Sequence, residues 1–167
     1  MTTTWEIRPI PQDVVSVLRT SDDAGREPRL VVDDEGGSPL RCCLTRSKPG
    51  EQIALVSYAP LRRWAERHGV DPGPYDEVGP VFVHAYACGG AEPAARVPAE
   101  LVDNGVCRAY AQDGTIIRGL LVDPGHPAAK RTVEDALEEL FADAETAFVH
   151  VRAVGHGCFT YEAQRAA

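Results

Sequence analysis

Cysteine and histidine are the residues in this chain whose types and spacing could do chemistry. Thiolate sulfur and imidazole nitrogen are protein ligands of zinc and of other divalent transition metals. A cysteine beside a histidine can also act as a nucleophile. These residue types therefore predict either a metal centre or a reactive thiol. The positions concerned are Cys42, Cys43, His84, Cys88, Cys107 and Cys158, with His150 and His156 near the last of them.

His84 and Cys88 are separated by three residues, a spacing that suits one metal ion only if the chain turns between them. On a continuous strand their Cα atoms would lie about 13 Å apart, at about 3.3 Å per residue. One helical turn would bring them to about 6 Å. Cys42 and Cys43 could add one or both thiolates, although the side chains of neighbours on a strand point apart. The alternative is that these cysteines pack as small hydrophobic residues.

A second candidate site lies on residues 148–154, which alternate in the manner of a strand. Alternation places His150 and Arg152 on one face and predicts that the valine-rich face is buried. Arg118 and Tyr86 could join them to form a pocket for a small anion, because arginine binds carboxylates bidentately and histidine titrates near neutrality. The alternative is a solvent-exposed sheet face.

Cys158 follows the turn Gly155-His156-Gly157 and is a candidate nucleophile. His150 is the other candidate catalytic residue, as a proton donor or acceptor. The alternative for Cys158 is a purely structural role, because on a strand the side chains of Cys158 and His156 would point the same way without touching.

The five cysteines are odd in number, and the first residues lack the basic and apolar segments of a signal peptide. We therefore expect a cytoplasmic protein with reduced, metal-bound or reactive thiols rather than disulfides.

The elements that must position these residues are mostly strands, with a hairpin at Asp113-Gly114. Helices are predicted near residues 13–18, 61–68 and 133–144, the last with an apolar stripe of helical period that begins after Thr132. Residues 21–40 are predicted to be mostly loop. We expect an α+β fold: a mainly antiparallel sheet with one long helix in the C-terminal half and one or two short helices packed on it. The predicted strands are 5–10, 52–58, 81–84, 107–112, 115–122, 148–154 and 158–162.

Composition narrows the function classes. The chain has 167 residues, a net charge of −8, 44% hydrophobic residues and 25% charged residues, which predict one soluble domain over residues 1–167. It has no apolar run long enough to span a membrane, and it lacks the basic stripe of a nucleic-acid-binding protein. No glycine-rich phosphate loop occurs, so we expect no nucleotide cofactor. We expect a small-molecule substrate and a monomer or homodimer.

Three segments together resemble a bacterial family known as domain of unknown function 1203. The resemblance extends over nearly the whole chain, from about residue 7 to residue 164, and it implies no established activity. The segments are Cys43-Leu44 with Pro49-Gly50-Glu51, residues 74–84 with Cys88, and residues 149–152 with Cys158-Phe159.

The resemblance also implies a ligand set. The family's C-x-x-C-L element matches Cys43, but its first cysteine falls at Leu40, where this chain has no thiol. Cys43, His84 and Cys88 therefore map onto a four-ligand zinc site resembling a treble clef, and Cys42 is displaced by two positions. Three ligands with an open position would suit a catalytic metal, and loss of the ion is the alternative.

The leading hypothesis is a small enzyme that acts on an anionic metabolite, with zinc or another divalent transition metal held by Cys43, His84 and Cys88. One alternative is a non-catalytic module with a structural zinc ion that contacts another protein. The other is a metal-free thiol enzyme.

Overall fold

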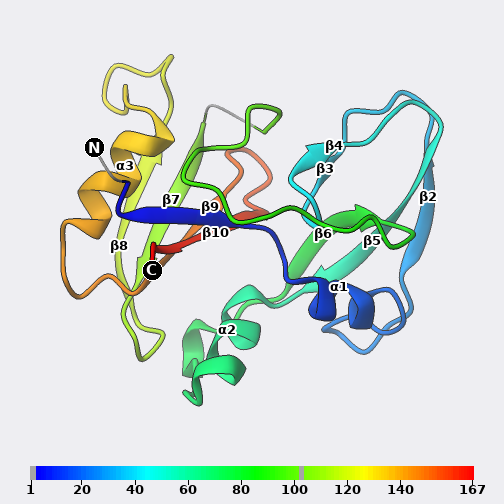
Figure 1. The fold of residues 1–167 in the computed structure, drawn as a ribbon, viewed down its shortest axis with the longest axis horizontal. Coiled ribbons are helices and arrows are strands. Elements are labelled where there is room, and N and C mark those ends of the chain that lie inside the picture. Colours follow the sequence, from blue (N-terminus) through cyan, green and yellow to red (C-terminus); the bar gives the residue numbers. More distant parts are fainter. Residues whose placement is uncertain (1–2, 102–103) are drawn as a thin grey trace.

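Two five-stranded sheets lie side by side in the computed structural model, which describes residues 3–101 and 104–167 (Figure 1). In the first sheet every neighbouring pair of strands is antiparallel, and its order is β1 (Trp5–Arg8), β10 (Phe159–Arg165), β9 (Phe148–Arg152), β7 (Gly105–Tyr110) and β8 (Ile116–Val122). In the second sheet β3 and β6 are parallel and the other pairs antiparallel, and its order is β2 (Arg29–Asp33), β5 (Glu51–Tyr58), β6 (Gly79–His84), β3 (Pro39–Leu40) and β4 (Thr45–Arg46).

Three α-helices pack on these sheets within the described residues. Helix α3 (Val133–Phe141) lies against β1, β7 and β8 of the first sheet, and α1 (Gln12–Leu18) lies against β5 of the second. Helix α2 (Pro60–His68) directly follows β5 and stacks Trp64 on Phe148 of the first sheet, with ring centroids 4.0 Å apart. Helix α2 is joined to a strand of the second sheet and packs on the first sheet, so it links the two sheets.

The prediction of one sheet and one long helix is wrong. Helix α3 has nine residues, the same number as α2, and the strands form two sheets (Figure 1). The helix ends before residue 144 because Asp143 begins a turn: its carboxylate accepts the backbone N–H of Glu145 at 2.9 Å, and its carbonyl accepts that of Thr146 at 3.1 Å. A short polar side chain that binds the backbone locally competes with the helix in this way.

The second sheet was missed because part of it lies in residues 21–40, which the sequence indicated to be loop. Strand β2 is an edge strand, and its Leu30 and Val32 side chains are exposed. An exposed edge strand does not show the alternation of buried and polar residues that identifies a half-buried strand. Strand β3 has two residues, too few to show any pattern.

Other local predictions are confirmed. The start of α3 is a capping box, in which Thr132 Oγ1 accepts from the backbone N–H of Asp135 at 3.0 Å and Asp135 Oδ2 accepts from that of Thr132 at 2.9 Å. The hairpin between β7 and β8 turns at Asp113-Gly114, where Gly114 has φ +85°. A positive φ is the reason that glycine is favoured at this position.

Each sheet has a core of its own. Leu137 of α3 packs with Val149 in the first core, while Val15 of α1 packs with Val56 and Val83 in the second. None of the helices in the described residues is both long enough and apolar enough to cross a membrane.

Candidate metal centre

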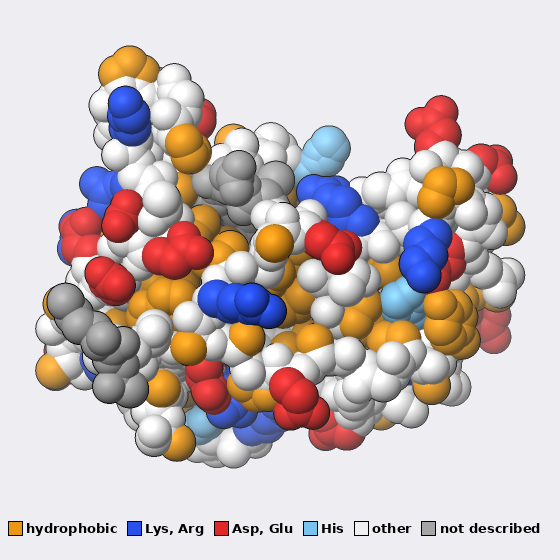
Figure 2. Space-filling model, turned by 45° about the horizontal axis from the view of Figure 1, so that its top comes forward, with side chains coloured by type: hydrophobic (Ala, Val, Ile, Leu, Met, Phe, Trp, Pro, Cys, Tyr) orange, Lys and Arg blue, Asp and Glu red, His pale blue; other side chains and the backbone are white. Residues whose placement is uncertain are grey.

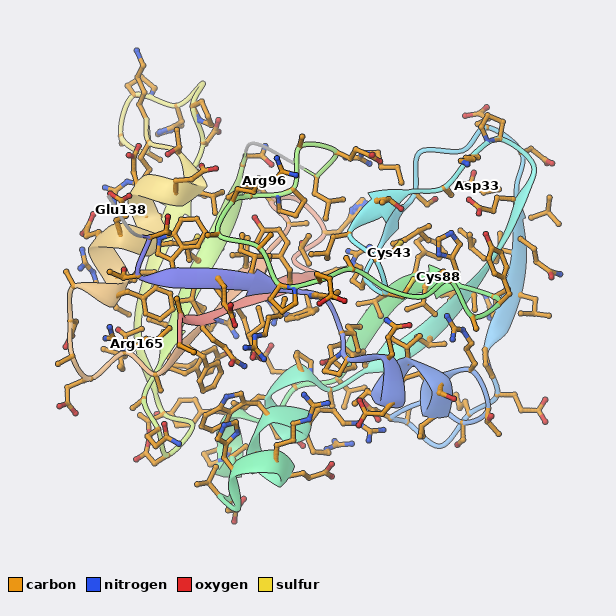
Figure 3. The ribbon with its side chains drawn as sticks, in the orientation of Figure 1. Asp33, Cys43, Cys88, Arg96, Glu138 and Arg165 are labelled. Atoms are coloured by element: carbon orange, nitrogen blue, oxygen red, sulfur yellow. The ribbon has the colours of Figure 1, made fainter. Side chains whose placement is uncertain are left out.

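Two turns of the second sheet bring one imidazole and three thiols together. The turn between β3 and β4 contributes Cys42 and Cys43, and the chain that leaves β6 contributes His84 and Cys88. One ligand atom from each of the four residues lies within 4.8 Å of each of the others. Figure 3 labels Cys43 and Cys88, which lie close together on these two segments.

The spacing of these atoms matches a tetrahedral zinc site. Cys42 Sγ lies 3.9 Å from Cys43 Sγ, and His84 Nδ1 lies 3.4 Å and 3.6 Å from these two sulfurs. With zinc bonds of about 2.3 Å to sulfur and about 2.1 Å to nitrogen, tetrahedral geometry requires about 3.8 Å between sulfurs and about 3.6 Å from sulfur to nitrogen. The four residues are therefore close to the arrangement that one ion needs.

The two adjacent cysteines converge because their segment is a turn and not a strand. The backbone N–H of Leu44 donates to the carbonyl of Leu40 at 2.9 Å, and Leu44 has φ +60°. This left-handed conformation is rare for a residue with a side chain and reverses the chain directly after the cysteines. The expectation that Cys42 and Cys43 point apart applies to extended backbone and does not hold here.

The chain also turns after His84, as a shared metal site requires. Strand β6 ends at His84, and Gly89 and Gly90 both have positive φ values. A Cβ on Gly90 would lie 2.5 Å from Gln12 Nε2, which donates to the carbonyl of Cys42 at 3.0 Å. Helix α1 therefore packs against both turns and holds them in position.

A carboxylate orients the imidazole of His84. His84 Nε2 lies 3.0 Å from Glu51 Oε1, and the Tyr86 hydroxyl donates to the same oxygen at 2.6 Å. A carboxylate accepts hydrogen bonds, so Nε2 carries the proton and the Nδ1 lone pair faces the sulfurs. The hydrogen bond from Tyr86, together with that from the Lys48 backbone, lowers the pKa of Glu51. Histidines that bind metal ions are usually held by a carboxylate in this way.

The environment of Cys43 favours its thiolate, whereas that of Cys42 favours its thiol. A hydrogen bond from the Cys42 thiol lowers the pKa of Cys43, and the same bond together with burial raises the pKa of Cys42. The Thr45 hydroxyl lies 3.0 Å from Cys43 Sγ, and the backbone N–H of His84 donates to Cys42 Sγ at 3.2 Å. Thiolate is the form that binds metal ions.

The sequence placed Cys43, His84 and Cys88 in one site and left the role of Cys42 open. The structure brings all four together. The position of Cys42 next to Cys43 indicated that it could be a ligand, but the expectation of a strand, in which neighbouring side chains point apart, argued against this role. Glu51 was missed as a candidate site residue, although acidic side chains commonly support histidine ligands.

The remaining cysteines lie outside this cluster. Cys107 is in the core of the first sheet, where burial raises the pKa of its thiol to about 12. Cys158 is half-buried at the end of the β9–β10 turn, with its Sγ 3.9 Å from the carbonyl of His156.

The residues proposed for an anion pocket lie in separate places. Arg152 forms an ion pair with Glu77 at 3.2 Å, while Arg118 on the edge strand β8 pairs with Glu139 of α3. Strand β7 lies between β8 and β9, so these two arginines do not share a site. Tyr86, another member of that set, contacts Glu51 beside the Cys/His cluster.

His150 lies inside the protein and not on an exposed face. Its side chain is fully buried, with the rings of Tyr110 and Phe159 centred 4.9 Å and 5.2 Å away. His150 Nε2 lies 3.0 Å from Glu162 Oε2, on the strand position directly opposite. Both faces of β9 are covered: Val149 and Val151 pack in the core that contains α3, and Phe148 packs on Trp64 of α2.

Fold and site together define a protein of two five-stranded, mainly antiparallel sheets with a Cys₃His cluster at the edge of the second. The model of the family described as "Protein of unknown function (DUF1203)" matches residues 37–165. The chain therefore belongs to the DUF1203 family, as the three segments indicated. No curated protein and no solved structure matches the chain significantly.

Proposed function

We propose that Cys42, Cys43, His84 and Cys88 bind a zinc ion whose role is structural. The observation that carries this proposal is the fourth donor: the ligand atoms of three cysteines and one histidine lie within 4.8 Å of one another. Zinc is four-coordinate and tetrahedral in structural sites, and Cys₃His is one of its usual ligand sets.

A closed ligand set supports a structural role over a catalytic one. A catalytic zinc ion keeps one coordination position for water or substrate. The catalytic hypothesis rested on three ligands, and Cys42 supplies the fourth. With all four positions taken by protein atoms, the ion would have no position to activate water or polarise a substrate.

The position of the cluster would allow such an ion to stabilise one edge of the second sheet. Strands β3 and β4 have two residues each, and β3 pairs with β6 at a single position, Leu40 opposite Phe82. Strands this short contribute little stability of their own. A zinc ion would cross-link the β3–β4 turn to the end of β6, and its binding free energy would contribute to the folding of this part of the sheet.

Metal analysis of the untagged protein tests the proposal. We expect one zinc ion per chain, and we expect replacement by cobalt to give the intense visible absorption of a tetrahedral thiolate site. Cys88→Ser should lower the metal content to well below one ion per chain. Cys158→Ser is the matched control, because Cys158 is also half-buried but lies outside the cluster.

Two outcomes would overturn the proposal. One is a metal content far below one ion per chain in wild-type protein purified with zinc present. The other is an equal loss of metal in the Cys88→Ser and Cys158→Ser variants, because only Cys88 belongs to the cluster.

A further inference from the structure

Arg41 is a buried cation at the junction of the two sheets. The residue is 4% exposed, its Nε donates to the carbonyl of Phe159 in β10 at 2.8 Å, and its Nη1 donates to that of Pro39 in β3 at 2.6 Å. Arg41 forms no ion pair with the described residues, and its Nη2 makes no hydrogen bond with them. Burial of a charge without a counter-charge costs free energy, so binding of an anion beside this guanidinium would be favourable.

Arg41 lines a groove of about 450 Å³ between the second sheet and the β9–β10 turn of the first. The volume lies within the range of small-molecule sites. Its walls are mostly apolar, with Leu55 of β5 and Phe82 of β6 on one side and Val154 of the β9–β10 turn on the other. His156 and Cys158 of the same turn complete the lining. None of the described residues that line the groove is acidic.

We propose that this groove binds a small carboxylate that has an apolar body. The free N–H groups of Arg41 can donate to both oxygens of a carboxylate, the bidentate geometry for which arginine is suited. One arginine balances one negative charge, which favours a monoanionic carboxylate over a phosphate. The apolar walls would take up the rest of the ligand.

The groove is distinct from the Cys/His cluster. The chain has a net charge of −8, and on the face shown in Figure 2 the Lys and Arg side chains are scattered among Asp and Glu. No residue of the groove belongs to the Cys₃His cluster. The groove is therefore a second site, and it goes beyond the proposed zinc centre.

Cys158 provides a reporter for binding, because its half-buried thiol lines the groove. The test measures the rate at which iodoacetamide alkylates Cys158 in the full chain, followed by mass spectrometry of its peptide. Three probes are compared: octanoate, octanol with a similar body and no charge, and acetate with the charge and almost no body. We expect octanoate to slow alkylation saturably, and octanol and acetate to have little effect at the same concentration.

Two variants identify the groups involved. Arg41→Met should weaken protection by octanoate about tenfold or more, since it removes hydrogen bonds to a charged group. This variant also loses the contacts to β3 and β10, so a second one is needed in case it fails to fold. Val154→Glu places a negative charge at the rim, where the residue is 42% exposed, and should also weaken protection. Leu121→Glu is the matched control, because Leu121 is 44% exposed on β8 and does not line the groove.

The outcomes separate clearly. The proposal is supported if octanoate is the only probe that protects Cys158, and if Val154→Glu weakens this protection while Leu121→Glu leaves it unchanged. Equal protection by octanol and octanoate would show that the groove binds apolar molecules without regard to charge, and it would overturn the role of Arg41. The absence of protection by any probe, or equal effects of the two glutamate variants, would also overturn the proposal.

Discussion

His84 Nδ1 lies 3.4 Å from Cys42 Sγ, although 42 positions separate the two residues in the chain. The contact joins the β3–β4 turn to the end of β6. In the described part of the chain, β3 and β6 pair as strands at one position, Leu40 with Phe82. The stability of this edge of the second sheet should therefore depend on whether the four ligand atoms bind a metal ion.

Removal of the metal should destabilise the protein. A ligand at 1,000 times its dissociation constant stabilises the folded state by about 4 kcal/mol. In a chain of this size that stabilisation corresponds to a change of about 8–16 °C in the melting temperature. We expect a strong chelator to lower the melting temperature of wild-type protein by this amount and to have little effect on Cys88→Ser. Complete removal of the ion without any change in melting temperature would argue against a structural role.

Glu51→Gln should weaken metal binding and leave the ligands in place. The carboxylate holds Nε2 of His84 at 3.0 Å and makes Nδ1 a better ligand, and loss of such support costs about 10–100-fold in metal affinity. Competition with a chromogenic chelator measures this change. Glu66→Gln on α2 is the control, because Glu66 is largely exposed and lies outside the cluster. Equal affinities in the two variants would show that Glu51 does not support the ligand.

Thr132→Ala should destabilise the protein by about 1 kcal/mol. The substitution removes the acceptor for the Asp135 backbone N–H at the start of α3. Urea denaturation should show a lower midpoint with an unchanged slope. Thr20→Ala, at an exposed position after α1, should leave the midpoint unchanged. Equal stabilities of the two variants would show that the capping box contributes nothing.

Asp33→Asn should reduce stability in a pH-dependent manner. The Ser47 hydroxyl donates to Asp33 Oδ2 at 2.5 Å, and this bond is the main cause of the lowered pKa of Asp33 (labelled in Figure 3). A carboxyl whose pKa is lower in the folded state contributes stability above its unfolded value of about 3.9 and loses that contribution as the pH falls. The difference in urea midpoint between wild type and Asp33→Asn should be constant near pH 7 and shrink below about pH 4. A difference that does not change down to pH 3 would contradict this account.

Local features of the fold could be predicted from the sequence. The capping box at Thr132 and the hairpin at Asp113-Gly114 depend on residues within three positions of each other, so their chemistry is visible in the sequence. The two-sheet arrangement could not be predicted, because β2 is an exposed edge strand and β3 has two residues. The length of α3 depended on the competing turn at Asp143.

The sequence by itself determined that an imidazole and a thiol lie four positions apart, at His84 and Cys88, after a strongly β-forming run that ends near His84. Only the tertiary structure decided that Cys42 would join the other three donor residues and that Arg41 would be buried without a counter-charge among the described residues. The reason is physical: the direction of a side chain in a turn follows from the backbone conformation, here set at Leu44. That conformation is selected by packing against distant segments such as α1 and β10, and not by the neighbouring residues alone.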